Sequence, residues 1–165
     1  MIVECFLDTN VLLYAASRNP KDARKKTTAN DLIQEKFFGL SIQVAQEFYV
    51  VATRKADFQM SGEKALEWLD NFQEFPCLAI DMGLVKNAAF LASRYGLSYW
   101  DGAILAAASA LGAPIVYSED MNHGQIYGDL QVCNPFRDLH EAGFHEDTAP
   151  SAAIRSAAPP RRSAQ

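Results

Sequence analysis

Apolar and polar segments alternate along the first 133 residues. Short apolar runs, typical of buried strands, lie at 1–7, 40–42, 77–80, 115–117 and 130–133. Between them, apolar positions recur at helical spacing over 11–16, 20–38, 44–56, 61–72, 82–95 and 99–111. Because parallel strands are joined by crossover helices, this order predicts a three-layer α/β/α fold with a mainly parallel, roughly five-stranded sheet.

Acidic residues follow several of the predicted strands directly. Asp8, Asp81 and Asp120 occupy such positions, and Glu47 and Asp101 lie near the starts of two helices. Ligands of parallel α/β sheets bind beyond the carboxyl ends of the strands, where these side chains meet. We assign Asp81 to capping the helix at 82–95, and the other four acids are the candidates for a functional site.

Each candidate also has a purely structural interpretation. Asp8 can cap the helix that follows it, and Asp120 can belong to a simple turn. Glu47 shares a stripe with apolar residues, where it would be desolvated and could pair with Arg54. Asp101 has capping-box spacing from Ser98, which for this acid alone is the favoured interpretation. The case for a functional site therefore depends on the four acids together.

Four acids at one sheet edge would repel one another unless cations bind there. Oxygen ligands without cysteine or histidine favour Mg²⁺, with Mn²⁺ as a substitute, over zinc. The three histidines show no zinc-ligand spacing. Magnesium held by carboxylates suits phosphodiester hydrolysis, because it screens the phosphate and lowers the pKa of a bound water. One or two such ions at the site are compatible with this chemistry.

The length and composition predict one domain and an extra tail. With 165 residues and 49% apolar side chains, the chain can bury a substantial core. Residues 148–165 contain six Ala, three Pro, three Ser and three Arg without any acid, so we expect this tail to be disordered. The remaining 1–147 hold 12 basic and 20 acidic residues, a net charge of −8.

Basic residues cluster early within this acidic domain, where an exposed cation patch could guide a polyanion. The structural alternative is an ordinary solvated helix face. The cluster consists of Arg18, Lys21, Arg24, Lys25 and Lys26.

Cysteine use and hydropathy predict a cytoplasmic protein. Cys5, Cys77 and Cys133 each lie in an apolar run, which predicts buried free thiols rather than a disulfide framework or a zinc site. The weakly polar stretch 102–117 is too short to span a bilayer, and the start of the chain lacks the basic flank of a signal peptide. We expect no membrane association.

The candidate acids stand within four segments that resemble the PIN domain, and the chain resembles the VapC-type toxins of bacterial toxin–antitoxin pairs. Their order and spacing carry the resemblance over residues 1 to about 140. The segments are Phe6-Leu7-Asp8-Thr9-Asn10-Val11-Leu12, Gln46-Glu47-Phe48, Leu97-Ser98-Tyr99-Trp100-Asp101-Gly102-Ala103-Ile104 and Tyr117-Ser118-Glu119-Asp120-Met121-Asn122-His123-Gly124.

The resemblance implies a magnesium-dependent endoribonuclease, usually a homodimer, silenced by an antitoxin peptide in a groove beside the active site. It places the acidic quartet, as catalytic and metal-binding residues, on Asp8, Glu47, Asp101 and Asp120. Thr9 or Ser118 would be a polar helper, and Glu119 is an alternative to Asp120. The basic cluster would then contact RNA, and the tail has no counterpart in the family.

Three other interpretations compete with this one. A catalytically silent PIN-fold binding module would have no reason to keep four mutually repelling acids. A receiver domain would carry acidic neighbours after its first strand and a Lys after its last, whereas Thr9-Asn10 follows Asp8 and Asn134 follows Cys133. A phosphatase of the haloacid-dehalogenase type would need a second Asp where this chain has Asn10.

Overall fold

The computed structural model describes residues 3–55 and 58–138. The predicted domain boundary at residue 147, the predicted disordered tail 148–165, and His140 and His145 lie outside the described residues.

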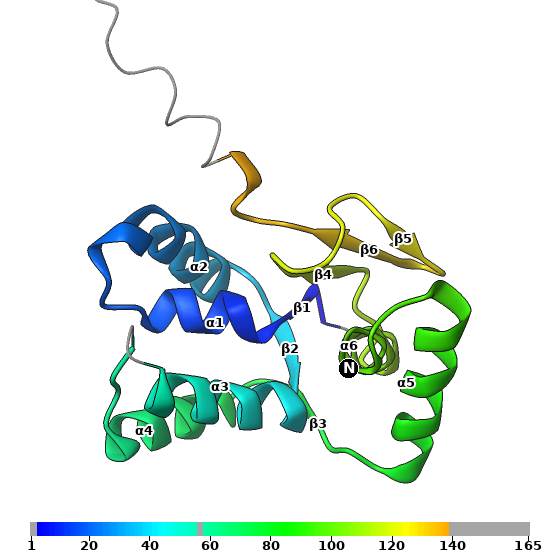
Figure 1. Ribbon diagram of the computed structural model, residues 1–165, viewed down its shortest axis with the longest axis horizontal. Coiled ribbons are helices and arrows are strands. Elements are labelled where there is room, and N and C mark those ends of the chain that lie inside the picture. Colours follow the sequence, from blue (N-terminus) through cyan, green and yellow to red (C-terminus); the bar gives the residue numbers. More distant parts are fainter. Residues whose placement is uncertain (1–2, 56–57, 139–165) are drawn as a thin grey trace, which may run out of the picture.

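The protein is built on one six-stranded sheet of order β3-β2-β1-β4-β6-β5 (Figure 1). All neighbouring strands are parallel except β5 and β6. The predicted mainly parallel sheet is confirmed, with the two-residue β5 as an additional strand. The strands are β1 (Cys5–Leu7), β2 (Phe38–Ser41), β3 (Cys77–Leu78), β4 (Ile115–Tyr117), β5 (Ile126–Tyr127) and β6 (Leu130–Cys133).

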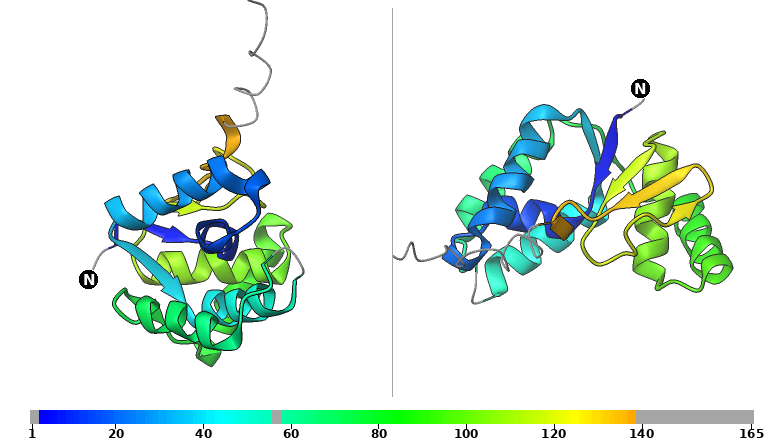
Figure 2. Two further views of the ribbon diagram at one scale, coloured as in Figure 1. Left: turned by 90° about the vertical axis from the view of Figure 1, so that its left-hand side faces the viewer. Right: turned by 90° about the horizontal axis from the view of Figure 1, so that it is seen from above.

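Helices cover both faces of this sheet, which confirms the predicted three layers. Figures 1 and 2 show α1 to α4 on one side of the sheet and α5 with α6 on the other. A short 3₁₀ helix, Pro20–Asp22, precedes α2. The helices are α1 (Thr9–Ala16), α2 (Ala23–Glu35), α3 (Ile42–Arg54), α4 (Gly62–Phe72), α5 (Met82–Tyr95) and α6 (Tyr99–Ala110).

Five of the helices begin at a side chain that caps the first turn. Asp8, Ser41, Ser61, Asp81 and Ser98 each accept a hydrogen bond from a backbone N–H of the helix that follows. The capping roles predicted for Asp81 and Ser98 are confirmed. Since Asp8 and Ser41 also terminate parallel strands β1 and β2, α1 and α3 both start at the carboxyl edge of the sheet.

The cysteines are free thiols, as predicted, but only one is fully buried. Cys5 in the central strand β1 is buried, and this burial raises the pKa of its thiol to about 11. Cys133 is half-buried, and the prediction that Cys77 is buried is wrong. Cys77 is exposed because β3 is a two-residue edge strand with one neighbour.

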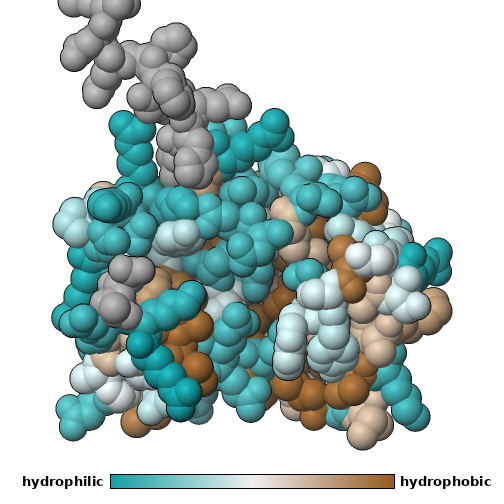
Figure 3. Space-filling view, viewed as in Figure 1, coloured by the Kyte–Doolittle hydropathy of each residue, from teal (hydrophilic) through white to brown (hydrophobic). Residues whose placement is uncertain are grey.

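Hydrophobic side chains also reach the surface in one region. In Figure 3 the surface over α2 is hydrophilic, whereas hydrophobic residues are exposed along the lower edge, near the starts of α3 and α5. Ile42, Ile80, Met82 and Trp100 are among the large exposed side chains. Within the described segments, no helix combines the length and the apolar character needed to cross a membrane.

Small residues allow α5 and α6 to pack closely. Gly102 is buried in the first turn of α6 against Ala88 and Ala92 of α5. A Cβ atom at residue 102 would overlap the Ala88 carbonyl oxygen and lie 3.0 Å from the Ala92 Cβ. Glycine is therefore required here by the neighbouring backbone, not by its own dihedral angles.

We expect Gly102→Ala to destabilise the protein by about 1–3 kcal/mol, because α5 must move away from α6. This loss exceeds the gain of at most about 1 kcal/mol from replacing a helical glycine by alanine. Chemical denaturation measures the difference. Gly62→Ala is the matched control, because its Cβ would make only an ordinary contact of 3.6 Å with the Tyr49 hydroxyl. A Gly102→Ala protein as stable as the control would contradict the packing argument.

Candidate active site

Strands β1 and β4 end side by side and set the position of the site. Leu7 pairs with Tyr117 in parallel register, and the Asp8 N–H donates to the Tyr117 carbonyl oxygen at 3.0 Å. The residues that follow the two strands, Asp8 and Ser118, are therefore neighbours. Ser118 is fully buried, and its hydroxyl donates to Asp8 Oδ2 at 2.7 Å.

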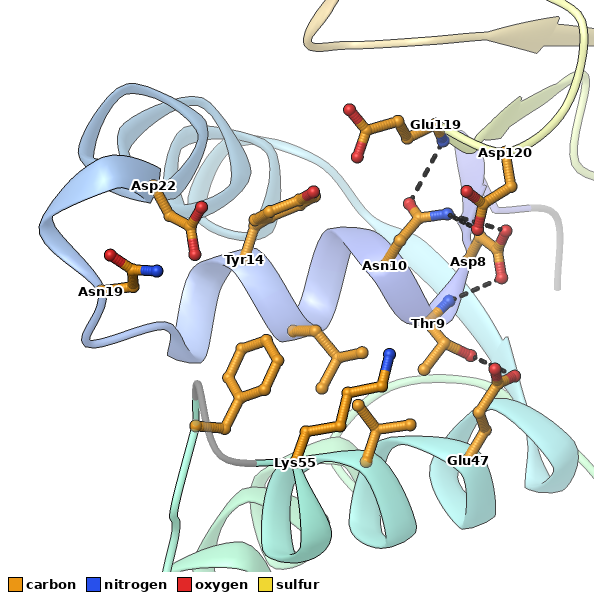
Figure 4. A pocket seen from close by; sticks show the side chains of 13 residues that line it. Asp8, Thr9, Asn10, Tyr14, Asn19, Asp22, Glu47, Lys55, Glu119 and Asp120 are labelled. Carbon is orange, nitrogen blue, oxygen red and sulfur yellow. Dashed lines mark hydrogen bonds between the residues drawn. The ribbon is translucent and has the colours of Figure 1, made fainter.

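A pocket of about 330 Å³ opens beside this pair, between α1 and α3 (Figure 4). Three predicted site acids line it: Asp8 at the end of β1, Glu47 on α3 and Asp120 after β4. Its other lining residues are Thr9, Asn10, Leu13, Tyr14, Asn19, Asp22, Val51, Lys55, Phe58 and Glu119.

Asn10 connects the acids and was not predicted as a site residue. Its amide nitrogen donates to Asp8 Oδ2 at 3.2 Å and to Asp120 Oδ2 at 3.1 Å. Its carbonyl oxygen accepts from the Glu119 backbone N–H at 3.2 Å. One amide thus holds two carboxylates and the loop after β4 together. One clue to this is visible in the sequence, because Asn10 follows Asp8 by two residues and lies between the predicted strand at 1–7 and the predicted helix at 11–16.

The two acids after Ser118 have different partners. Lys25 forms an ion pair with Glu119, donates to the Tyr14 hydroxyl at 2.9 Å and lies 4.3 Å from the centre of the Tyr14 ring. Asp120 is exposed on the pocket side and faces Asp8 across the Asn10 amide. The negative charge of Glu119 is therefore already offset, and the geometry favours Asp120 over Glu119 as the site acid.

Glu47 lies in the pocket, although not as a desolvated side chain. The expectation that it is desolvated is wrong, because Val44, Phe48 and Ala52 form the buried face of α3 and Glu47 is exposed beside it. Glu47 Oε2 accepts a hydrogen bond of 3.0 Å from the buried Thr9 hydroxyl. The ion pair with Arg54 that we considered is absent from the described part of the chain.

Asp101 does not line the pocket with the other three acids. Its backbone N–H donates to Ser98 Oγ at 3.1 Å, and its carboxylate accepts from the Ser98 hydroxyl at 2.8 Å. The first bond confirms the helix cap by Ser98. The second comes from the Ser98 hydroxyl, whereas the reciprocal bond of a capping box comes from the backbone N–H of the capping residue. Within residues 3–55 and 58–138, no group of three Asp, Glu, His or Cys side chains is close enough to hold one metal ion.

The predicted basic cluster is divided between exposed and engaged residues. Arg18, Lys21 and Arg24 are exposed, whereas Lys25 pairs with Glu119 and Lys26 donates to the Ser17 carbonyl oxygen at 2.8 Å. A cation outside this cluster, Lys55 at the end of α3, lines the pocket instead.

Burial and neighbouring charge act on Asp8 in the same direction. Desolvation, with smaller contributions from the charges of Glu47 and Asp120, raises the pKa of Asp8 to about 6, although hydrogen bonds from Ser118 and Thr9 favour the ionised form. The carboxylate is thus held in a place where its negative charge is costly. A cation bound beside it would relieve this cost.

The chemistry of the donors suits a hard divalent cation. Asp8, Glu47 and Asp120 offer only oxygen atoms as ligands, which Mg²⁺ and Mn²⁺ prefer. Within the described residues, none of the three forms an ion pair with a lysine or arginine. Asp8 and Asp120, which accept from the same Asn10 amide, could hold such an ion together with water. Glu47 would have to turn towards them, since no three acids of the described residues are close enough to share an ion in this arrangement.

Comparison with known proteins identifies relatives of this architecture. The sequence model of the PIN domain family matches residues 5–128. A search of curated proteins found no match.

Three solved structures illustrate the shared fold. VapC20 of Mycobacterium tuberculosis, described as a Sarcin-Ricin loop cleaving toxin, is 20% identical with a TM-score of 0.57 and covers 72% of this chain and 91% of its own. A toxin-antitoxin complex from Klebsiella pneumoniae is 16% identical with a TM-score of 0.57, covering 79% and 97%. FitAcB from Neisseria gonorrhoeae is 21% identical with a TM-score of 0.55, covering 80% and 98%.

We expect Asp8→Asn to stabilise the metal-free protein at neutral pH. Because the folded-state pKa of Asp8 lies above its ordinary value of 3.8, ionisation of Asp8 costs stability as pH rises through about 6. The variant should exceed the native chain by at most about 3 kcal/mol at pH 7.5, with the difference shrinking towards pH 4. Denaturation in chelator at several pH values measures it.

Asp31→Asn, an exposed substitution on α2, serves as the control for the general loss of one negative charge. A stability difference for Asp8→Asn that is the same at pH 4.5 and pH 7.5 would show that the Asp8 charge is not costly in the folded state.

Proposed function

The chain belongs to the PIN domain family, and from this premise we propose that it is a metal-dependent endoribonuclease, the toxin of a toxin–antitoxin pair. The observation that carries the proposal is the convergence of Asp8, Glu47 and Asp120 in one pocket at the carboxyl edge of the sheet. VapC20, described as a Sarcin-Ricin loop cleaving toxin, has the same fold and supports an RNA substrate.

In the proposed mechanism Asp8, Glu47, Asp101 and Asp120 would hold Mg²⁺, with Mn²⁺ as a substitute, once their side chains turn towards a common ion. Bound magnesium supplies a water of lowered pKa and offsets the charge of the phosphodiester. Asn10 keeps Asp8 and Asp120 together, and the buried Ser118 and Thr9 hydroxyls orient Asp8 and Glu47. Asp101 would bind the metal only if its carboxylate gave up the hydrogen bond from the Ser98 hydroxyl.

The exposed cations Arg18, Lys21 and Arg24 are proposed to guide the RNA backbone. Lys25 and Lys26 are assigned a different role, because their partners are Glu119 and the Ser17 carbonyl oxygen. Lys25 keeps Glu119 neutralised, so that only Asp120 of the two adjacent acids acts at the site.

We expect the purified chain to cleave structured RNA in Mg²⁺ or Mn²⁺ and to stop in chelator. Asp8→Asn, Glu47→Gln and Asp120→Asn should each abolish most of the activity, because each removes a negative ligand. Asn10→Ala should reduce activity by roughly 10- to 100-fold, the loss typical of a residue that orients a ligand. Initial rates on an end-labelled RNA measure these effects.

Glu119→Gln tests the alternative site acid, since it changes the acid next to Asp120 while leaving Asp8, Glu47 and Asp120 in place; the stability of this variant is measured alongside its rate, because the Lys25 ion pair is also lost. Asp101→Asn separates the two roles of that residue: a lost rate with unchanged stability supports metal binding, and a lower melting temperature with unchanged rate supports the helix cap. Equal cleavage by the native chain in chelator, or by Asp8→Asn, would overturn the proposal.

A catalytically silent binding module remains the second candidate function. The specific observation that favours it is the absence, within residues 3–55 and 58–138, of three acids close enough to share one ion. Calorimetric titration with Mn²⁺ distinguishes the two functions. A metal-dependent nuclease binds Mn²⁺, and Asp8→Asn and Asp120→Asn weaken this binding. A silent module shows no Mn²⁺ binding that depends on these two residues.

We also propose an antitoxin partner and a cytoplasmic location. An apolar groove of about 670 Å³ lies between α3 and α4, and we propose that it receives an antitoxin peptide. Helix α3 contributes residues both to this groove and to the acidic pocket. The groove is lined by Ile42, Ala45, Gln46, Tyr49, Val50, Leu66 and Leu69.

A homodimer is proposed through the exposed apolar residues at the starts of α3, α5 and α6. Met82 and Trp100 are 67% and 65% exposed, which is unfavourable for large side chains unless a partner covers them. We expect the native chain to be dimeric and Met82→Glu with Trp100→Glu to be monomeric in light scattering. Leu66→Glu, in the α3–α4 groove, should leave the dimer intact. A native monomer would contradict the dimer.

A further inference from the structure

The pocket extends well beyond the three acids. Figure 4 shows Asp8 and Glu47 at one end, and Asn19 and Asp22 at the opposite end of α1. Its volume of about 330 Å³ falls within the range of pockets that bind small organic ligands, and exceeds what one or two ions with their waters need. The part remote from the acids is therefore available for a portion of the substrate.

Lys55 places a positive charge along this pocket. Glu47, Val51 and Lys55 are spaced four residues apart and form one stripe of α3 that faces the pocket. Figure 4 shows the Lys55 side chain reaching from α3 towards α1. Among the residues that the structure describes, its ammonium group forms no ion pair. A cation that none of these residues pairs, placed beside an acidic site, suits a phosphate group.

Phe58 adds an aromatic surface next to Lys55. The Phe58 N–H donates to the Lys55 carbonyl oxygen at 3.1 Å, which holds the two residues together where α3 ends. Phe58 is half-buried, lines the pocket and forms no aromatic pair with another described residue. The Tyr14 ring, by contrast, already carries Lys25 against it. Phe58 is thus the aromatic ring that can accept a stacked nucleobase.

Hydrogen-bonding groups stand at the far end of the pocket. Asn19 Oδ1 accepts from the Lys21 N–H at 3.0 Å, and no other described residue accepts from the two N–H donors of the Asn19 amide group. Asp22 Oδ2 accepts from the Ser17 hydroxyl at 2.6 Å, and its other oxygen has no hydrogen bond within the described residues. A carboxylate oxygen accepts hydrogen bonds from exocyclic amino groups such as N4 of cytosine.

We propose that this half of the pocket binds the nucleotide adjacent to the cleaved phosphodiester. Lys55 contacts its phosphate, Phe58 stacks on its base, and Asn19 with Asp22 faces the edge of that base. The inference rests on the proposed RNA substrate and adds a preference: a base with an amino group is bound more tightly than uracil, because Asp22 accepts a hydrogen bond from it.

The test is direct binding of single-stranded oligonucleotides to the full chain. Fluorescence anisotropy with labelled 12-nucleotide oligocytidine and oligouridine in Mg²⁺ uses an Asp8→Asn background, which prevents cleavage during the measurement. Lys55→Gln should weaken binding. It should also reduce the slope of log affinity against log salt concentration by about one, as expected for the loss of one phosphate contact. Phe58→Leu should weaken binding about fivefold or more, as expected for the loss of one stacked base.

Specificity is tested in the same assay. The Asp8→Asn background should prefer oligocytidine over oligouridine, and adding Asp22→Asn should remove this preference while the protein keeps its fold by circular dichroism. Lys86→Gln on α5, an exposed lysine on the other side of the sheet, is the matched control for charge and should change neither affinity nor preference.

The outcomes separate this inference from the proposed function. If the native chain cleaves RNA but Lys55→Gln and Phe58→Leu bind oligonucleotides as tightly as the control, the nucleotide subsite is wrong and the nuclease stands. If these variants lose binding while the native chain never cleaves RNA, the subsite stands and the nuclease proposal is wrong. An unchanged affinity for Lys55→Gln together with a reduced affinity for Lys86→Gln would also overturn the subsite.

Discussion

The burial of a carboxylate at the ends of adjacent parallel strands is the constraint on which this structure depends. Asp8 is fixed by the register of β1 and β4, which also places Ser118 against it. The burial that orders Asp8 raises its pKa, so the folded chain carries a charge that its surroundings disfavour. Asn10 limits this cost by donating to two carboxylates at once. The site is therefore ordered by neutral donors and retains its negative charge for a cation.

Most of the fold follows from local rules that are visible in the sequence. The period of apolar positions locates the strands and helices, and capping residues such as Asp81 and Ser98 set where helices begin. The exceptions depend on tertiary position. The two-residue β5 forms only because β6 offers an antiparallel neighbour, and Cys77 is exposed because its strand lies near a sheet edge. Neither fact is encoded in the residues themselves.

The candidate site was predictable to the extent that topology brings strand ends together. Asp8 and Asp120 follow adjacent strands and do converge, and Glu47 reaches the pocket from α3. Asp101 illustrates the limit, because its spacing from Ser98 also satisfies a local cap, and side-chain rotation decides between the two partners. Lys55 and Asn10 were missed for a related reason. An exposed lysine and an asparagine in the first turn of a helix have no pattern of their own, so only the three-dimensional arrangement distinguishes them.

The ion pair between Lys25 and Glu119 joins α2 to the loop after β4, although 94 positions separate the two residues along the chain. Tyr14 supports the same lysine from α1, so three segments meet at one ammonium group. Loss of either partner would leave the other half-buried and uncompensated. Evolution at these two positions should therefore be concerted: among homologous sequences, replacement of the lysine should accompany replacement of the glutamate, and exchange of the two charges should be tolerated better than either change alone.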